Sequence, residues 1–485
     1  MAPRTLEFGR TAMYVNGRWV DAPDGGRRAI VNPATEEVFA EVSYGGRECA
    51  RGALEAARDA MPAWRSLTAY GRAAYLWKIA EGMRGRCDEI ARVMTLEAGK
   101  PLAESRSETL AAADQFEWYA EEIKRAYGRI APARKEGKRI FVIRHPVGVC
   151  ATISPFNFPA LLQARKIAPA LAAGCAVVAR PASQTPLTLI RIFEVIDEIG
   201  LPLGVANLVM GEARDLSEEF LTNPICRKIS FTGSTAVGKE LQRRGADRLV
   251  RLSLELGGHA PVIVFPDADV EAAAKASVIG KFRNNGQVCI SPSRFYAHKD
   301  IVKQYTEASV EFARALKQGN GLDEGVEIGP MIDRAALERA EWLVGDALSG
   351  GARVLTGGRR PPRFDKGFFF EPTVLSRVHP SMAIMKEEPF APIMPILEFE
   401  TLDEVIAKAN DTRYGLASYV MTQDITAAIK MAESLEFGII GLNDTVPATA
   451  EAPFGGMKES GYGREGGVEG LDGYLEIKYV SLALR

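Results

Sequence analysis

The chain has few cysteines and histidines, and neither type is clustered. Its 485 residues include six cysteines without a CxxC spacing and four histidines that lie far apart. This pattern gives no basis for a disulfide framework or a zinc site, and we expect no metal ion in catalysis. Scattered thiols are typical of a reducing compartment, so we expect a cytoplasmic protein.

Long apolar runs and an excess of one charge are also missing. No segment approaches the roughly 18 uninterrupted apolar residues of a membrane helix, and the N-terminus lacks the apolar stretch of a signal peptide. The net charge of -2 gives no sign of a basic surface for nucleic acid. We therefore expect neither a membrane nor a nucleic acid as a partner.

The patterns that are present predict an α/β protein built from two series of elements. With 47% hydrophobic residues the chain suits a globular protein, and its length exceeds what one core usually supports. Helix and strand patterns alternate over 159–258 and again after 261, with expected strands near 353, 369, 393 and 418. Gly257 and Gly258 separate the series as a hinge, which places Glu255 at a cleft.

Two further strand patterns, at 139–143 and 473–484, stand apart from their neighbours in the chain. Strands without local partners are typical of contacts between protein chains. They predict an arm that pairs with another subunit.

Two short segments supply a candidate nucleophile and a candidate base. FRNNGQVCIS (Phe282 to Ser291) carries Cys289 on a polar turn, where substrate can reach a thiol. LELGG (Leu254 to Gly258) places Glu255 at the end of a strand, where α/β enzymes keep their chemistry. Each residue also has an ordinary explanation, because lone cysteines are mostly core residues and strand-end carboxylates commonly pair with lysine.

A third segment, KISFTGSTAVGKEL, predicts a dinucleotide site. Gly233 and Gly238 bracket a strand-to-helix turn, so main-chain N–H groups and the Ser234 hydroxyl are placed to meet a pyrophosphate. The GxTxxG spacing is weaker evidence than GxGxxG, because many such turns only connect a strand to a helix.

Taken in order, these segments and others resemble the aldehyde dehydrogenase superfamily over essentially the whole chain. The matching segments are SPFNFP (Ser154 to Pro159), ARPASQTP (Ala179 to Pro186), FTGS (Phe231 to Ser234), LELGG, GQVC, KEEPFAP (Lys386 to Pro392) and APFGGMKESGYGRE (Ala452 to Glu465). The resemblance implies a Rossmann-type NAD(P)-binding domain (1–127 and 147–256), an α/β catalytic domain (257–459) and a β-strand oligomerisation arm (128–146 and 460–485). A homodimer or homotetramer is implied.

The resemblance also assigns catalytic roles. Cys289 looks like the nucleophile, and Asn157, with the main-chain N–H of Cys289, looks like the oxyanion hole. Glu255 looks like the general base that activates water. These roles agree with the chemistry, because a tetrahedral oxyanion needs donors that are already in place.

For the cofactor, NAD or NADP, Glu388 resembles the carboxylate that holds the nicotinamide ribose and Phe390 the aromatic beside the nicotinamide. Many relatives have lysine where Arg180 stands, and NAD-preferring ones often have glutamate where Ser183 stands. A guanidinium without an opposing carboxylate should tolerate NADP. The expected cofactor-binding residues are Ser154, Phe156, Arg180, Ser183, Gly233, Ser234, Gly238, Leu256, Glu388 and Phe390.

For the substrate, a small aldehyde, Arg165 and Arg283 match arginines that bind the distal carboxylate in succinate semialdehyde dehydrogenases. Either arginine alone would be interpreted as one partner of a surface ion pair. Two guanidinium groups together can bind one carboxylate as a clamp. The serine that completes the clamp in some relatives is not matched, since Ala448 and Thr449 occupy that region. We take Thr449 as a substrate-binding candidate, and the substrate's length stays open.

Several alternatives remain. The segments GQVCISPSRFYAH and GLNDTVPATAEAPFGG also resemble α-ketoglutaric semialdehyde dehydrogenases, and a broad-range aliphatic enzyme is a further reading. A CoA-acylating enzyme is disfavoured because such relatives lack the base where Glu255 stands. A non-catalytic relative is disfavoured by the intact Cys289, Glu255 and Asn157. Relatives with a redox-switch disulfide have cysteine where Ser291 stands, so that switch is not expected.

Overall fold

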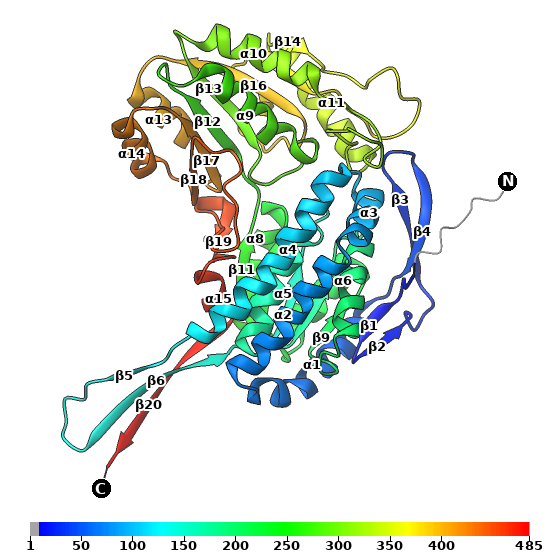
Figure 1. Cartoon of the computed structure of the whole chain (residues 1–485), viewed down its shortest axis with the longest axis vertical. Helices are drawn as coiled ribbons and strands as arrows, with labels where there is room; N and C mark the ends of the chain where they lie inside the picture. Colours follow the sequence, from blue (N-terminus) through cyan, green and yellow to red (C-terminus); the bar gives the residue numbers. More distant parts are fainter. Residues whose placement is uncertain (1–8, 485) are drawn as a thin grey trace, which may run out of the picture.

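The computed structural model describes residues 9–484 as two open sheets covered by helices, with a strand arm projecting from one end (Figure 1). This confirms the α/β prediction. The expectation about an N-terminal signal concerns partly residues 1–8, which lie outside the described residues. No helix in the described part of the chain is long and apolar enough to cross a membrane.

The first sheet has eight strands, and its central five are parallel. Their order is β19 (Gly461–Tyr462), β11 (Arg251–Glu255), β10 (Cys226–Thr232), β7 (Val149–Ile153), β8 (Val177–Arg180), β9 (Ala206–Leu208), β1 (Met13–Val15) and β2 (Arg18–Val20). Strands β11 to β9 pair in parallel, whereas β19, β1 and β2 are antiparallel at the edges. This sheet therefore joins the beginning and the end of the described chain.

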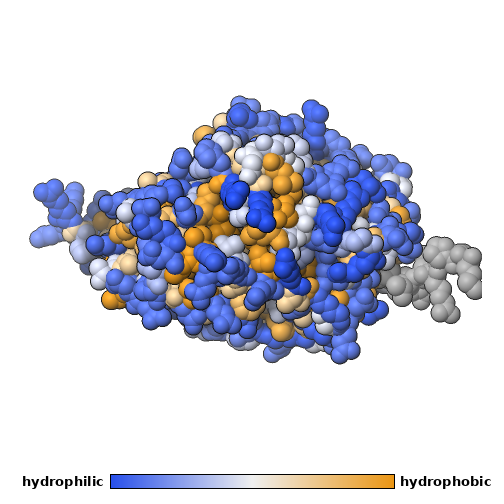
Figure 2. All heavy atoms as spheres, turned by 90° about the horizontal axis from the view of Figure 1, so that it is seen from above, coloured by the Kyte–Doolittle hydropathy of each residue, from blue (hydrophilic) through white to orange (hydrophobic). Residues whose placement is uncertain are grey.

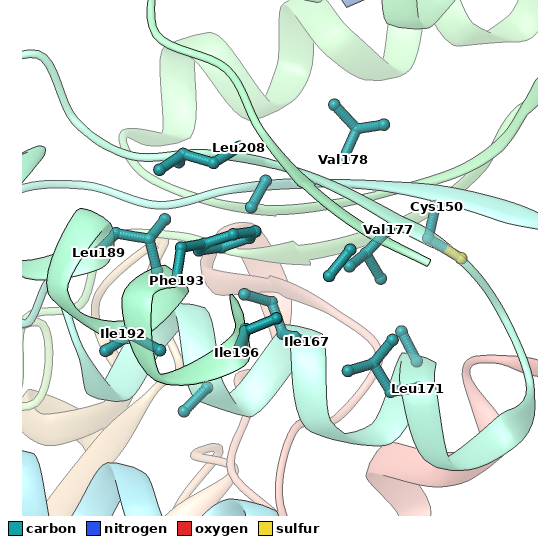
Figure 3. Close-up of a cluster of buried hydrophobic side chains, with 14 of the residues drawn as sticks. Cys150, Ile167, Leu171, Val177, Val178, Leu189, Ile192, Phe193, Ile196 and Leu208 are labelled. Atoms are coloured by element: carbon teal, nitrogen blue, oxygen red, sulfur yellow. The ribbon is translucent and has the colours of Figure 1, made fainter. Parts of the chain in front are cut away.

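Helices surround this sheet, some in contact with its strands and others packed on those helices. They are α1 (Arg47–Ser66), α2 (Ala69–Gly85), α3 (Cys87–Ala98), α4 (Leu102–Glu122), α5 (Leu161–Ala173), α6 (Leu187–Glu198), α7 (Ala213–Thr222) and α8 (Thr235–Gly245). Figure 3 shows Ile167 and Leu171 of α5 and Phe193 of α6 on one side of the strands that carry Val177 and Leu208. All five are buried, and each such side chain stabilises the fold by about 1.5–3 kcal/mol.

The second sheet has seven strands, and β14 alone among its described strands is antiparallel. Their order is β14 (Arg353–Thr356), β15 (Thr373–Ser376), β16 (Ile393–Phe399), β13 (Pro292–His298), β12 (Ala260–Val264), β17 (Ala417–Met421) and β18 (Ile439–Leu442). Its helices are α9 (Val270–Phe282), α10 (Val302–Ala315), α11 (Arg334–Ser349), α12 (Ala383–Lys386), α13 (Leu402–Asn410) and α14 (Ile425–Ser434). Viewed from this end, the surface is largely hydrophilic around a central hydrophobic area (Figure 2).

The strand expected near residue 369 is wrong. Phe369 lies outside any strand, and the next strand begins at Thr373, after Pro372. Phe369 is buried because its ring stacks on Phe364 with centroids 4.1 Å apart. Apolar side chains that bury themselves by ring stacking give the same sequence signal as a strand.

The two isolated strand patterns pair with each other. β20 (Leu475–Ala483) runs antiparallel to β6 (Lys138–Pro146), which also pairs with β5 (Arg129–Ala131). The preceding helix, α15 (Glu469–Asp472), lies at the base of this arm (Figure 1). Ile130, Ile477 and Tyr479 on the arm are 71%, 68% and 58% exposed.

Candidate active site

The three expected catalytic residues lie where elements of the two sheets meet. Glu255 is the last residue of β11, opposite Thr232 at the end of β10, and Asn157 follows the parallel strand β7. Cys289 lies in the loop before β13. A Cβ at Gly258 would lie 2.4 Å from the carbonyl oxygen of Cys289, so only glycine allows this approach. The glycine pair thus brings the Glu255 strand against the Cys289 loop.

Hydrogen bonds join the Asn157 loop to the Cys289 loop. Asn157 Nδ2 donates to the Gln287 carbonyl oxygen at 3.0 Å. Asn284 Nδ2 donates to the carbonyl oxygens of Asn157, at 3.1 Å, and Gln287, at 3.2 Å. Asn284 and Asn285 both have left-handed backbones, with φ of 46° and 56°. Asparagine tolerates this conformation better than most residues, which explains the NNG sequence of the turn.

The thiol of Cys289, the candidate nucleophile, has a raised pKa. Burial raises the pKa of Cys289 to about 12, with Glu388 and Glu255 adding to the shift and Arg165 opposing it. These charges shift the pKa of the thiol because the surroundings of the sulfur have a low dielectric constant. Attack on a carbonyl thus requires a base to remove the thiol proton.

Glu255 is a buried carboxyl that is free to act as a base. Burial first, then the charge of Glu465, raises its pKa well above the usual range, whereas Lys166 opposes the shift. Both carboxylate oxygens are buried without a hydrogen-bond partner within residues 9–484. A Cβ at Gly455 would lie 2.8 Å from Glu255 Oε1, so the glycine keeps space at that oxygen. The arrangement suits a carboxyl that takes a proton from a thiol or a water.

A buried ion pair, which the sequence did not reveal, supports the loop that carries Asn157. Lys100 and Glu108 are fully buried, with Lys100 Nζ 2.6 Å from Glu108 Oε2. Lys100 also donates to the Asn157 carbonyl oxygen, and Glu108 Oε1 accepts from the main-chain N–H of Ala160 at 2.9 Å and Leu161 at 3.2 Å. The pair therefore fixes both Asn157 and the N-terminus of α5, which carries Arg165.

The expected pyrophosphate turn lies at the N-terminus of α8. Ser234 is the N-cap residue, and its hydroxyl accepts from the Val237 N–H at 3.4 Å. A Cβ at Gly238 would lie 2.5 Å from Leu256, so glycine lets the helix pack closely on the end of β11. Gly233 is equally restricted by the Phe231 ring. This geometry fits a phosphate at a helix N-terminus.

Glu388 and Phe390 lie close to the catalytic loops, as expected. Glu388 is partly buried, and its Oε2 lies 2.4 Å from where a Cβ on Gly257 would stand. Its Oε1 has no hydrogen-bond partner within the described part of the chain, and burial raises its pKa to about 7. The Phe390 ring meets Phe156 edge-on with centroids 5.9 Å apart. A buried acceptor beside an aromatic pair fits a ribose and a nicotinamide ring.

The remaining expected cofactor residues follow the parallel strands β7 and β8. Ser154 is buried and accepts from Gln163 Nε2 at 2.9 Å. Arg180 is 8% exposed and donates to Ser183 Oγ at 3.1 Å. Its Nε is buried without a partner in the described structure, so the guanidinium retains an unused donor.

Arg165 and Thr449 line the same cavity. The cavity has a volume of about 620 Å³, and its walls include Trp118 and Leu161. Arg165 is 3% exposed, its guanidinium lies 4.1 Å from the Phe454 ring centroid, and its Nε has no partner among residues 9–484.

Arg283 does not line this cavity in the described structure. Its guanidinium lies 5.0 Å from the Phe158 ring centroid. Nearby, Glu104 accepts the Asn284 N–H, and the Arg283 charge lowers the pKa of Glu104 against the dominant effect of burial. Arg283 is therefore partly engaged by an acidic neighbour.

Comparison with known proteins identifies the chain. The model of the aldehyde dehydrogenase family matches residues 19–480. The chain belongs to the aldehyde dehydrogenase family. It is 45% identical over 484 residues to a glutarate-semialdehyde dehydrogenase of Pseudomonas putida, with 100% of both chains covered. It is 44% identical to the succinate-semialdehyde dehydrogenase (NADP(+)) of Escherichia coli, covering 98% of each chain.

The structural likeness is equally extensive. An Escherichia coli NADP-dependent enzyme matches this aldehyde dehydrogenase with a TM-score of 0.97 at 44% identity, covering 98% of this chain and 99% of that one. The two-sheet architecture with a strand arm is thus the aldehyde dehydrogenase fold, as the sequence predicted.

In this aldehyde dehydrogenase, the sequence missed the groups that act on the catalytic residues from a distance in the chain. Lys166 bonds to Glu465 and donates to Thr232 Oγ1 at 2.6 Å, beside Glu255. Lys281 is fully buried, and burial lowers its pKa to about 7, while Glu388 opposes that shift. Glu465 lay within a recognised segment, but nothing in the sequence connected Lys166 or Lys281 to the site.

Proposed function

We propose that this aldehyde dehydrogenase oxidises an aliphatic semialdehyde with a distal carboxylate, such as succinate semialdehyde, using NADP or NAD. The observation that carries the proposal is the buried Arg165 guanidinium, which lines the cavity and acts on Cys289 with an unused Nε donor. A buried cation with an unused hydrogen-bond donor destabilises the protein unless an anion binds to it. The names of the succinate- and glutarate-semialdehyde dehydrogenase relatives support the same substrate class.

The chemistry follows from the residues at the site. A base takes the Cys289 proton, and the sulfur forms a bond to the aldehyde carbon. Asn157 Nδ2 and the Cys289 N–H donate to the resulting oxyanion. The bound nicotinamide supplies the hydride acceptor and, as a ring cation, favours the thiolate. Loss of hydride from the adduct leaves a thioester on Cys289. Glu255 then takes a proton from water, which attacks the thioester and releases the carboxylic acid.

Glu255 also favours water over CoA as the group that cleaves the thioester. Its buried oxygens have no protein partner in the described structure, and Gly455 leaves space beside one of them. A carboxyl placed in this way can activate a small molecule such as water.

The substrate proposal is tested by comparing charged and uncharged aldehydes. Arg165→Met and Arg283→Met should each lower kcat/KM for succinate semialdehyde by about one to two decades, since a charge-assisted hydrogen bond contributes roughly 1.5–3 kcal/mol. Butanal, which has the same chain length without the carboxylate, should change little. Glutarate and α-ketoglutaric semialdehydes, assayed alongside, locate the preferred length. Equal losses on butanal would reject the clamp and favour a broad-range aliphatic enzyme.

The domain roles and assembly are part of the proposal. Residues 1–127 and 147–256 hold the dinucleotide, residues 257–459 supply the nucleophile, and the arm forms a homodimer or homotetramer in the cytoplasm. The exposed apolar residues on the arm support assembly, because such strands seldom stay unpaired. Strand β19, within the segment assigned to the arm, pairs with the Glu255 strand, so the boundary near residue 460 is not sharp.

A further inference from the structure

A cluster of donors surrounds Ser183, and two of its members come from a distant part of the chain. The hairpin β3 (Arg27–Asn32) and β4 (Glu37–Ser43) is followed by Tyr44. The Tyr44 hydroxyl lies 2.9 Å from Ser183 Oγ, and Arg180 donates to the same oxygen at 3.1 Å. Three polar groups therefore converge beyond the carboxyl end of β8.

Arg28 adds a second guanidinium to this cluster. Its guanidinium lies 5.2 Å from the Tyr44 ring centroid, and its Nη1 donates to the Tyr44 hydroxyl at 3.5 Å. Its ion pair with Glu212 spans 3.8 Å, with side chains 41% and 64% exposed, so that pair is weak. Arg28 is therefore free to bind a stronger anion.

The backbone holds the hairpin end in place. Gly45 forms a parallel bridge with Gly211, and the Gly45 N–H donates to the Met210 carbonyl oxygen at 2.9 Å. A Cβ on Gly211 would lie 2.0 Å from the Gly45 oxygen, so this approach requires glycine at position 211. Tyr44 is fixed directly beside that bridge, which makes the cluster a preformed feature of the fold.

The position of the cluster relative to the other cofactor residues defines its ligand. Strands β10, β7 and β8 are adjacent and parallel, so Gly233, Ser154 and Arg180 share one edge of the sheet. With the pyrophosphate at the N-terminus of α8, a ribose reaching past β7 brings its 2′ position to the Ser183 cluster.

We propose that Arg28 and Tyr44 complete, with Arg180 and Ser183, a subsite for the 2′-phosphate of NADP. This inference rests on the proposed use of NAD or NADP. A phosphate monoester carries nearly two negative charges and three acceptor oxygens, which two guanidinium groups and two hydroxyls can satisfy. The orphaned Nε of Arg180 is one donor still available for it. Glu212 acts against the phosphate, because its carboxylate competes for Arg28.

The test measures nucleotide binding without aldehyde or turnover. Isothermal titration with adenosine 2′,5′-bisphosphate and with 5′-AMP separates the 2′-phosphate from the rest of the nucleotide. Arg28→Met should weaken the bisphosphate about tenfold or more and leave 5′-AMP within about twofold. Tyr44→Phe should have a smaller effect of the same sign, and Glu212→Gln should strengthen the bisphosphate.

The matched control is Arg27→Met on the same strand. Arg27 pairs with Asp21 at 3.4 Å and Glu41 at 3.8 Å, so its removal changes the net charge equally and should leave both affinities unchanged. Equal weakening of both nucleotides by Arg28→Met, or none, overturns the subsite. A protein that binds both nucleotides as expected but oxidises no semialdehyde refutes the proposed function and leaves the subsite intact.

Discussion

At the scale of single residues, the site is defined by ionisable groups whose pKa values burial raises. Cys289, Glu255 and Glu388 all have raised pKa values for this reason, and each carboxylate makes ionisation of the thiol harder. Arg165 is the cation that acts in the opposite direction. The resting enzyme therefore protects its nucleophile from ionisation until the charge around it changes.

The pH dependence of Cys289 alkylation should reflect the raised pKa of its thiol. Because the thiol pKa is about 12, reaction with iodoacetamide in the nucleotide-free enzyme should rise about tenfold per pH unit from pH 7 to 10 without a plateau. Mass spectrometry of the peptide gives the rate, with the partly exposed Cys87 as an internal reference. Added NADP should raise the rate at pH 7.5. A plateau below pH 9 in the free enzyme would contradict this account.

At the scale of elements, buried polar pairs position the loops that follow the strands. The Lys100–Glu108 pair joins α4 to the Asn157 loop and to the first turn of α5. The pair connects residues that are far apart in the sequence, so no local sequence motif predicts it.

Lys100→Met should therefore destabilise the fold and slow the first chemical step. Removing one partner of a buried ion pair costs about 3–5 kcal/mol, because the other charge is left buried. The urea concentration at the midpoint of unfolding should fall. The rate of the burst of reduced cofactor should fall by a larger factor than the factor by which KM for the aldehyde changes. Arg106→Met, on the helix that carries Glu108, is the control, since its pair with Asp88 is exposed and worth about 1 kcal/mol or less. Similar urea midpoints for the two variants would reject the positioning role.

Sequence patterns revealed elements and motifs better than they revealed contacts. The alternation of helix and strand patterns located the parallel strands around Glu255 and the second sheet, because short apolar runs and glycine turns are local signals. They failed at Phe369, where ring stacking imitates a strand. Cys289, Glu255 and Asn157 were found from short segments, whereas Arg28 and Tyr44 were not. Their partner Ser183 lies about 140 residues away, and only the folded sheet edge brings them together.

At the scale of the whole molecule, the arm carries exposed apolar side chains on both faces of its three strands. Ile477 and Tyr479 alternate with Val480 and Leu482 along β20, and all four are at least 39% exposed. Surfaces of this kind are normally covered by another chain.

Two charges on the arm should therefore separate the subunits. The double variant Ile477→Asp/Tyr479→Asp should shift light-scattering mass toward the 52.7 kDa monomer, because a partner would have to bury both carboxylates. Leu249→Asp is the control, since Leu249 is 89% exposed but lies outside the arm. An unchanged mass in the double variant would show that assembly does not use this face.

The strand order of the first sheet bears on how the enzyme is made. All strands of the second sheet lie within residues 260–442, so it can form while the chain is still being synthesised. The first sheet cannot be completed then, because β19 at residues 461–462 pairs with the end of β11, where Glu255 stands. Domains fold during synthesis from the N-terminal side, so Glu255 is enclosed only after residues 461–462 have left the ribosome. A nascent chain thus carries its cysteine loop before its first sheet is complete, and chains that stop short of β19 lack the strand beside Glu255.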